Sequence, residues 1–216
     1  MRGGIVVRQS KTFIPTTREV PSSAEATSHK LLIKAGMVKQ VSAGVYTYLP
    51  LATRVIQKIE KVIREEHSKI GAAELLMPIL QSDEYWRKSG RWDKMGEELI
   101  RVTDRKKAGY ALSPTAEEII TQTVNNMITS YKQLPMNLYQ IQTKFRDEIR
   151  PRLGLLRCKE FIMKDAYSFH DSPESLRETY KDYYQAYSNI FDRFELKYRA
   201  VQADSGNIGG SYTHEF

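Results

Sequence analysis

The sequence holds a single cysteine, Cys158, among 216 residues. One cysteine excludes an internal disulfide and any zinc site built from several cysteines. The four histidines show no metal-ligand spacing, so we expect them to be structural or exposed: His29, His67, His170 and His214. The sequence therefore predicts no metal site formed by the protein alone.

Long apolar runs are also missing. No run approaches the roughly 18 apolar residues that a membrane span needs. The first residues, MRGGIVVRQSK, contain only a short apolar patch, which is too small for a secretory signal. We find no internal repeat and no low-complexity tract. These absences predict a cytoplasmic protein with no membrane partner.

What the sequence does contain is typical of a folded protein with a basic excess. Hydrophobic residues make up 41% of the chain, which argues against disorder. The length allows one large domain or two small ones. The formal net charge of +7 is compatible with an anionic partner such as a nucleic acid or a nucleotide.

Helical and strand patterns are mixed along the chain. Apolar spacing and capping signals predict helices over residues 26–40, 51–71, 115–131 and 172–194. Strand patterns cover residues 42–50, 73–80, 138–148, 157–169 and 197–204, and YTHEF (212–216) begins one more. Residues 1–28 are expected to form an amino-terminal arm and 81–110 a loop-rich segment, with the folded core over 29–216.

The strands at 138–148 and 157–169 decide the fold class. An eight-residue loop joins them, which suits an antiparallel hairpin and is too short for a parallel crossover. Since the remaining elements do not alternate as βαβ units, we predict an α+β fold in which helices flank an antiparallel sheet.

Alternation along these two strands sorts their side chains by face. In the first strand one face is polar, with Gln140, Gln142, Lys144, Arg146 and Glu148, and the other suits a core, with Tyr139, Ile141, Thr143 and Phe145. In the second strand one face carries Arg157, Lys159, Phe161, Met163, Asp165 and Tyr167. We expect the two polar faces to lie side by side as a floor with two guanidiniums, one carboxylate and one phenyl ring.

Two interpretations of this floor are open. A guanidinium group can form paired hydrogen bonds to phosphate oxygens. Stacking of a phenyl ring on a base contributes about 1–3 kcal/mol, so the floor suits a nucleotide. Alternatively, it is a solvated sheet face whose charges pair with each other, and such surface pairs contribute only about 0–1 kcal/mol. Periodicity alone does not separate the two.

The spacing of the charged residues resembles a known motif. FRDE (145–148), a loop and RCKEF (157–161) resemble motif 2 of class II aminoacyl-tRNA synthetases. SPTAEE (113–118) is similar to the Thr-x-Glu loop of bacterial prolyl-tRNA synthetases, and residues 44–80 resemble motif 1. The chain after about residue 10 thus resembles the amino-terminal part of that family's catalytic domain.

The resemblance implies specific roles. For ATP, Arg146 would hold the α-phosphate and the substrate carboxylate, Glu148 would contact the adenine end, Arg157 would bind the γ-phosphate and Phe161 would stack on adenine. For proline, Thr115 and Glu117 would hold the imino group, and Met163 and Tyr167 would line a small apolar pocket. Arg146 would be the catalytic residue in the ATP-dependent formation of prolyl-adenylate.

The resemblance also implies partners and missing parts. Mg²⁺ would accompany ATP, the prolyl group would pass to the 3′ end of proline tRNA, and motif 1 would form a homodimer. Motif 3, an editing insertion and an anticodon-binding domain are not found in this sequence. We therefore expect an incomplete class II catalytic core that is a poor catalyst by itself.

Several residues have plainer interpretations. Thr115 and Glu118 also have the spacing of a capping box for the helix that follows. Ala116 stands where the family usually has His, and Ser113 where Gly is commoner, which affects the geometry of that loop. Cys158 is expected to be a buried thiol. Arg150 and Arg152 would lie in a solvated turn, and Gly209, Gly210 and Ser211 would form a tight turn or approach the proline.

Two other functions compete with a proline–tRNA ligase. One is a truncated relative that binds tRNA or nucleotide without catalysis, and the other is a class II enzyme for serine, threonine or alanine.

Overall fold

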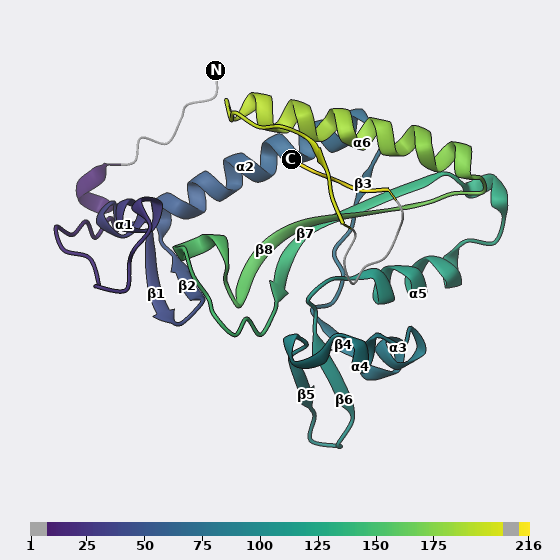
Figure 1. Cartoon of the computed structure of the whole chain (residues 1–216), viewed down its shortest axis with the longest axis horizontal. Helices are drawn as coiled ribbons and strands as arrows, with labels where there is room; N and C mark the ends of the chain where they lie inside the picture. The colour runs from purple at the N-terminus through teal and green to yellow at the C-terminus, as the bar shows by residue number, and fades with distance from the viewer. Residues whose placement is uncertain (1–7, 205–211) are drawn as a thin grey trace.

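An antiparallel ribbon runs through the centre of the computed structural model, which describes residues 8–204 and 212–216 (Figure 1). Its strands are β7 (Met136–Phe145) and β8 (Glu160–Phe169), and β3 (Ala73–Glu74) pairs with β7 in parallel. The register sets Gln142 opposite Met163. Because directly opposed residues share a face, the predicted side-by-side arrangement of the two polar faces is confirmed.

The connection between β7 and β8 is longer than predicted. Both strands stop short, so residues 146–159 lie outside the ribbon and the expected eight-residue loop is wrong. The amide of Arg146 still donates to the Lys159 carbonyl at 2.9 Å, but the Glu148 amide turns back to the Arg146 carbonyl at 2.8 Å. This turn ends the ladder, and a 3-10 turn, η4 (Gly154–Leu156), follows in the connection.

Two long helices, α2 (Pro50–Lys69) and α6 (Pro173–Arg193), pack on one face of the ribbon (Figure 1). The His67 ring of α2 lies 4.7 Å from the Tyr139 ring of β7. Both helices follow the prediction: the Ser172 side chain caps α6, and Gly71 follows α2 with a φ of 70°. The apolar stripe of α2 is only partly buried, since Val55 and Ile59 are exposed.

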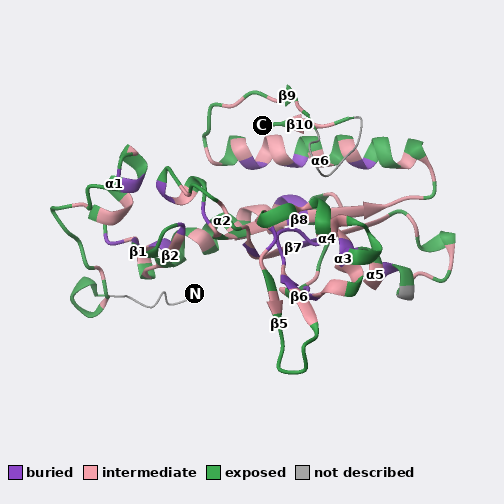
Figure 2. Ribbon diagram, turned by 60° about the horizontal axis from the view of Figure 1, so that its bottom comes forward, coloured by how far each residue is buried: buried purple, intermediate pink, exposed green. Residues whose placement is uncertain are grey.

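The opposite face of the ribbon is covered by α5 (Glu117–Met127) and carries one of the cores. The buried residues of this core pack against partly buried side chains of β7 and β8: Met77, Ala116, Ile120 and Val124. Helices therefore flank the sheet on both faces, and the predicted α+β class is confirmed. Figure 2 shows buried segments gathered along β7 and near the start of α5.

A second small sheet occupies the segment that was predicted to be loop-rich. Its strands are β4 (Leu80–Ser82), β6 (Gly109–Leu112) and β5 (Arg101–Thr103), in that order, and α3 (Asp83–Lys88), α4 (Arg91–Lys94) and the 3-10 turn η2 (Gly96–Glu98) adjoin them. Trp86, Leu99 and Ala111 form its core. The prediction was wrong because elements this short show no periodicity.

The amino-terminal part also departs from the prediction. The expected helix over 26–40 is α1 (Thr27–Lys34), and residues 42–50 form half of a hairpin, β1 (Val38–Ser42) with β2 (Val45–Tyr48). Gly36 ends α1 with a φ of 62°. An added Cβ there would lie 2.8 Å from the Pro15 carbonyl, so the close approach requires glycine.

The remaining elements are short. They are η1 (Gln9–Lys11), η3 (Tyr131–Gln133) and the antiparallel pair β9 (Val201–Gln202) and β10 (His214–Glu215), which confirm two predicted strands in shorter form. The predicted strand over 73–80 is divided by Pro78 into β3 and β4. Within residues 8–204 and 212–216, no helix is long and apolar enough to cross a membrane.

Candidate active site

A buried network of polar side chains forms the α5-side face of the β7–β8 ribbon. The Asp165 carboxylate accepts hydrogen bonds from Lys144 Nζ at 2.8 Å and from Gln140 Nε2 at 2.9 Å. Its Oδ2 also accepts from the Tyr167 hydroxyl. Lys144 is 0% exposed and Gln140 is 1% exposed. The solvated-face interpretation is therefore wrong for this part of the floor, where the charges are buried and compensated.

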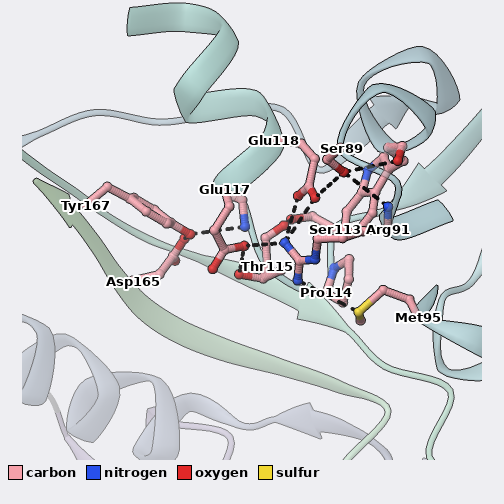
Figure 3. Close-up of polar contacts among 12 residues, drawn as sticks. Ser89, Arg91, Met95, Ser113, Pro114, Thr115, Glu117, Glu118, Asp165 and Tyr167 are labelled. Carbon is pink, nitrogen blue, oxygen red and sulfur yellow. Dashed lines mark hydrogen bonds and ion pairs between the residues drawn. The ribbon is translucent and has the colours of Figure 1, made fainter. Parts of the chain in front are cut away.

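The loop that precedes α5 brings Thr115 and Glu117 together (Figure 3). Thr115 Oγ1 donates a hydrogen bond to Glu117 Oε2. The N-cap of α5 is Ala116, without a side-chain cap, so Thr115 and Glu118 do not form the predicted capping box. The first turn of α5 carries Glu117 and Glu118, where the helix dipole stabilises negative charge.

Tyr167 links this loop to the buried network. Its hydroxyl oxygen accepts a hydrogen bond from the Ala116 amide at 3.0 Å while the hydroxyl proton points to Asp165 (Figure 3). Burial, followed by the hydrogen bond to Asp165, raises the pKa of Tyr167 far above its usual range. Tyr167 therefore stays protonated, and it lies beside Thr115 and Glu117 as the sequence interpretation required.

Arg146 lies between the loop and the aromatic ring of Phe161. Its Nη2 donates to the Pro114 carbonyl at 3.4 Å, and its Cζ lies 5.5 Å from the centre of the Phe161 ring. The guanidinium thus spans from the Thr115 and Glu117 loop to the stacking ring. A cation in this position can meet anionic groups that approach from either side.

Glu148 and Arg157 pair with each other, with Arg157 Nε 2.7 Å from Glu148 Oε2. The Arg157 side chain is 49% exposed, so it is free to turn toward a ligand. Arg157 thus matches the solvated-face interpretation, whereas its partner Glu148 is only 12% exposed. Met163 lies on the same face, opposite Gln142 in the register.

Some of the predicted site residues form two groups around different hollows, whereas Thr115, Met163 and Tyr167 line neither hollow. A hollow of about 450 Å³ on the α2 side is lined by Arg146, Glu148, Arg157 and Phe161, by apolar residues of α2, and by Ile162 and Lys164 of β8. Glu117 lines a second hollow of about 460 Å³ between α3, α4 and α5. Arg146 connects the groups through its contact with Pro114.

Sequence reasoning missed Arg91, the first residue of α4. Its Nη1 contacts Glu117 Oε2 at 3.2 Å and Glu118 Oε1 at 3.0 Å. Nothing in the sequence signals this pairing, because it depends on how α4 packs against α5. Lys144 and Asp165 were assigned to the correct face, but their burial as an ion pair was not foreseen.

Other predicted residues behave as expected. Cys158 is buried and donates its thiol proton to the Gly154 carbonyl, and burial raises the pKa of this thiol. Arg150 and Arg152 are exposed. The predicted turn at Gly209, Gly210 and Ser211 lies outside the described residues.

The sequence of this chain is similar to known proteins. A family model described as "tRNA synthetase class II core domain (G, H, P, S and T)" matches residues 100–216. The chain is 64% identical over 210 residues to the proline–tRNA ligase of Lysinibacillus sphaericus (strain C3-41) and 60% identical to that of Staphylococcus aureus (strain MRSA252). Each alignment covers 97% of this chain, which spans 37% of the length of these relatives.

Two solved structures share the fold. Prolyl-tRNA synthetase of Giardia lamblia in complex with prolyl-adenylate aligns with a TM-score of 0.75 and 23% identity, over 80% of this chain and 36% of that one. Prolyl-tRNA synthetase of Cryptosporidium parvum, complexed with halofuginone and AMPPNP, aligns with a TM-score of 0.76 and 19% identity, over 86% of this chain and 38% of that one. Since the family model matches more than half of the residues, this chain belongs to the class II tRNA synthetase core-domain family.

Proposed function

We propose that this chain carries the adenylate-forming site of a proline–tRNA ligase. The site would activate proline with ATP and pass the prolyl group to the 3′ end of proline tRNA. The observation that carries the proposal is the position of Arg146, in contact with the Pro114 carbonyl on one side and the Phe161 ring on the other. The identity of 64% to a proline–tRNA ligase supports the choice of substrate.

The ATP end of the proposed site consists of Arg146, Glu148, Arg157 and Phe161. Phe161 would stack on the adenine ring, a contact worth about 1–3 kcal/mol. Arg157 would leave its pairing with Glu148 to meet the γ-phosphate, which frees the Glu148 carboxylate to accept from the adenine amine. Because Glu148 is only 12% exposed, the adenine amine would replace the donor that its carboxylate loses.

The proline end consists of Thr115, Glu117, Met163 and Tyr167. Glu117 Oε1 would face the cationic imino group, since Oε2 already accepts from Thr115. Met163 and Tyr167 would pack against the ring methylenes. The bond from the Ala116 amide to the Tyr167 hydroxyl holds that wall against the loop.

The chemistry needs no protein nucleophile. A proline carboxylate oxygen attacks the α-phosphorus, a P–O bond forms, and the bond to the β-phosphate oxygen breaks so that pyrophosphate leaves. Arg146 would neutralise the two anions that approach each other and the charge that develops between them. In the second step a terminal tRNA hydroxyl takes the prolyl group and AMP leaves.

The proposal also covers Mg²⁺, the assembly state and the location. Among the described residues no cluster of three or more His, Cys, Asp or Glu could hold a metal ion, so Mg²⁺ would enter with the ATP phosphates. A homodimer would form through residues 44–80, where exposed Val55 and Ile59 offer apolar surface. The protein would act in the cytoplasm.

Amino-acid-dependent exchange of pyrophosphate into ATP tests the proposal in the full-length protein that contains this chain. We expect exchange with proline and at least 100-fold lower kcat/KM with alanine, serine and threonine. Exchange that is fastest with one of those three would replace proline as the substrate. An absence of exchange with every amino acid would favour a binding module and overturn the proposal.

A further inference from the structure

The guanidinium of Arg91 lies between the carboxylates of Glu117 and Glu118 (Figure 3). It contacts both oxygens of Glu118, at 3.0 and 3.2 Å, and one oxygen of Glu117, at 3.2 Å. The Ser89 hydroxyl donates to Glu118 as well, at 3.0 Å. Glu118 is 2% exposed in its side chain and Arg91 is 16% exposed, so the pair is largely removed from water.

The cluster of Arg91, Glu117 and Glu118 keeps one uncompensated negative charge, which is that of Glu117. Arg91 carries one positive charge and the two carboxylates carry two negative charges, so the cluster has a net charge of −1. Because Glu118 is buried against Arg91, its charge is already compensated. The remaining negative charge is that of Glu117, whose side chain is 33% exposed and can meet a cationic substrate group.

Arg91 also determines how many acceptors Glu117 offers. A carboxylate oxygen has two lone-pair sites, and both sites of Glu117 Oε2 are used, by Thr115 Oγ1 and by Arg91 Nη1. Glu117 Oε1 has no hydrogen-bond donor among the described residues. Thr115 has given its only proton to Glu117, so its hydroxyl oxygen can only accept from a ligand.

Two acceptors of this loop therefore remain for an amino-acid ligand, Glu117 Oε1 and Thr115 Oγ1. A secondary ammonium has two N–H donors, and a primary α-ammonium has three. A third donor of a primary amine would find the nearest remaining acceptor, Glu117 Oε2, already filled by Arg91. An unpaired donor lowers affinity by on the order of tenfold.

We propose that Arg91 is a specificity-determining positioning residue that limits Glu117 to one free oxygen, so that the site accepts secondary amines and disfavours primary ones. The inference rests on the proposed function, since it needs the amino acid to bind at Thr115 and Glu117. Part of the discrimination between imino and amino acids would then come from α4, which lies outside motif 2.

The test compares two variants of the full-length protein. Glu118→Gln is the matched control, because it removes the buried charge of Glu118 and keeps Arg91. The second variant adds Arg91→Met, which removes the guanidinium without leaving Glu118 as an unpaired buried charge. The substrates are L-alanine and N-methyl-L-alanine, which share a side chain and differ in the number of N–H donors, with proline alongside.

In pyrophosphate exchange, we expect the ratio of kcat/KM for N-methyl-alanine over alanine to fall about tenfold in the double variant relative to Glu118→Gln. The proline-to-alanine ratio falls in parallel, while KM for ATP stays within twofold. A purely structural role of Arg91 would lower kcat/KM for all three substrates together and leave the ratios unchanged, and that result would overturn the inference.

If the double variant does not fold, as judged by thermal unfolding, Arg91→Lys provides the same test. A lysine keeps the charge, but its side chain is one bond shorter than the path to Nη1, the nitrogen that makes all three carboxylate contacts, so the ratio should again fall. An unchanged ratio in Arg91→Lys would contradict the inference. Failure of the wild-type protein to activate any amino acid overturns the proposed function and this inference with it, whereas unchanged ratios in an active protein overturn this inference alone.

Discussion

The two faces of the β7–β8 ribbon place lysine side chains in different environments. On the face toward α5, Lys144 is fully buried and forms an ion pair with Asp165 at 2.8 Å. On the face toward α2 and α6, Lys164 forms no ion pair among the described residues and instead lies 4.2 Å from the Tyr187 ring, hydrogen-bonded to the Tyr187 hydroxyl. The site face compensates its charge, whereas the helix face surrounds a charge with aromatic rings.

The pKa values of two groups on the helix face reflect this difference. Burial lowers the pKa of Lys164 to about 8, and burial, followed by repulsion from Lys164, lowers the pKa of His67 to about 4. His67 Nε2 and the Tyr183 hydroxyl are buried without a hydrogen-bond partner in the described part of the chain. The comparison indicates that the site face is built to hold charges in fixed positions, while the helix face favours neutral groups.

The largest expected effect comes from breaking the compensated pair on the site face. Lys144→Met leaves Asp165 buried without its cation, so the free energy of unfolding should fall by about 3–5 kcal/mol. Urea unfolding of the full-length protein, with hydrogen exchange at the β7 and β8 amides, measures the loss. Lys159→Met is the matched control, since its pair with Asp147 is 35% and 49% exposed and contributes about 0–1 kcal/mol. Equal losses in the two variants would contradict the comparison.

The next effect lies on the helix face and depends on pH. The pKa of His67 is about 4 in the folded chain, against 6.5 for an unperturbed histidine. The unfolded chain therefore binds more protons between these values, and the wild type loses stability as the pH falls from 6.5 to 4. His67→Phe should remove this loss, which is on the order of 3 kcal/mol. The free energies of unfolding of the wild type and of His67→Phe, each measured at pH 7 and pH 4.5, should converge or cross as the pH falls. If the two proteins lose stability in parallel, His67 is not the cause of the loss.

The smallest effect is expected for Lys164→Met. Replacement by an apolar side chain removes the desolvation cost of this charge but also loses the hydrogen bond and the ring contact to Tyr187. These changes oppose each other, so stability should change by about 1 kcal/mol or less at pH 7. The folded pKa near 8 lies below the unperturbed value of 10.5. The wild type should therefore gain stability relative to the variant as the pH rises from 8 toward 10. A loss as large as that of Lys144→Met would erase the distinction between the faces.

Part of this arrangement was predictable from the sequence. Period-two alternation assigned Phe161 and Met163 to the correct face, because a one-residue slip in register would have exchanged the two faces. The caps and stops of α2 and α6 were also predictable, since Pro173 and Gly71 act through local backbone geometry.

The rest depended on tertiary packing. The buried pair of Lys144 and Asp165 looks like surface charge in the sequence, because only the packing of α5 and its preceding loop removes it from water. Arg91 was missed for a similar reason: its partners are 26 and 27 positions away, and α4 is too short to show a pattern. The capping box at Thr115 failed because the helix begins one residue later than expected, with Ala116 as its N-cap.

The central claim is that formation of the adenylate depends on Arg146. The most direct test is proline-dependent pyrophosphate exchange in the full-length protein with Arg146→Ala, with Arg177→Ala as the matched control, because Arg177 lies exposed on α6 beside Glu174. The account predicts a loss of at least about 100-fold in kcat/KM for Arg146→Ala and less than twofold for Arg177→Ala. A folded Arg146→Ala variant with activity within tenfold of the wild type would contradict it.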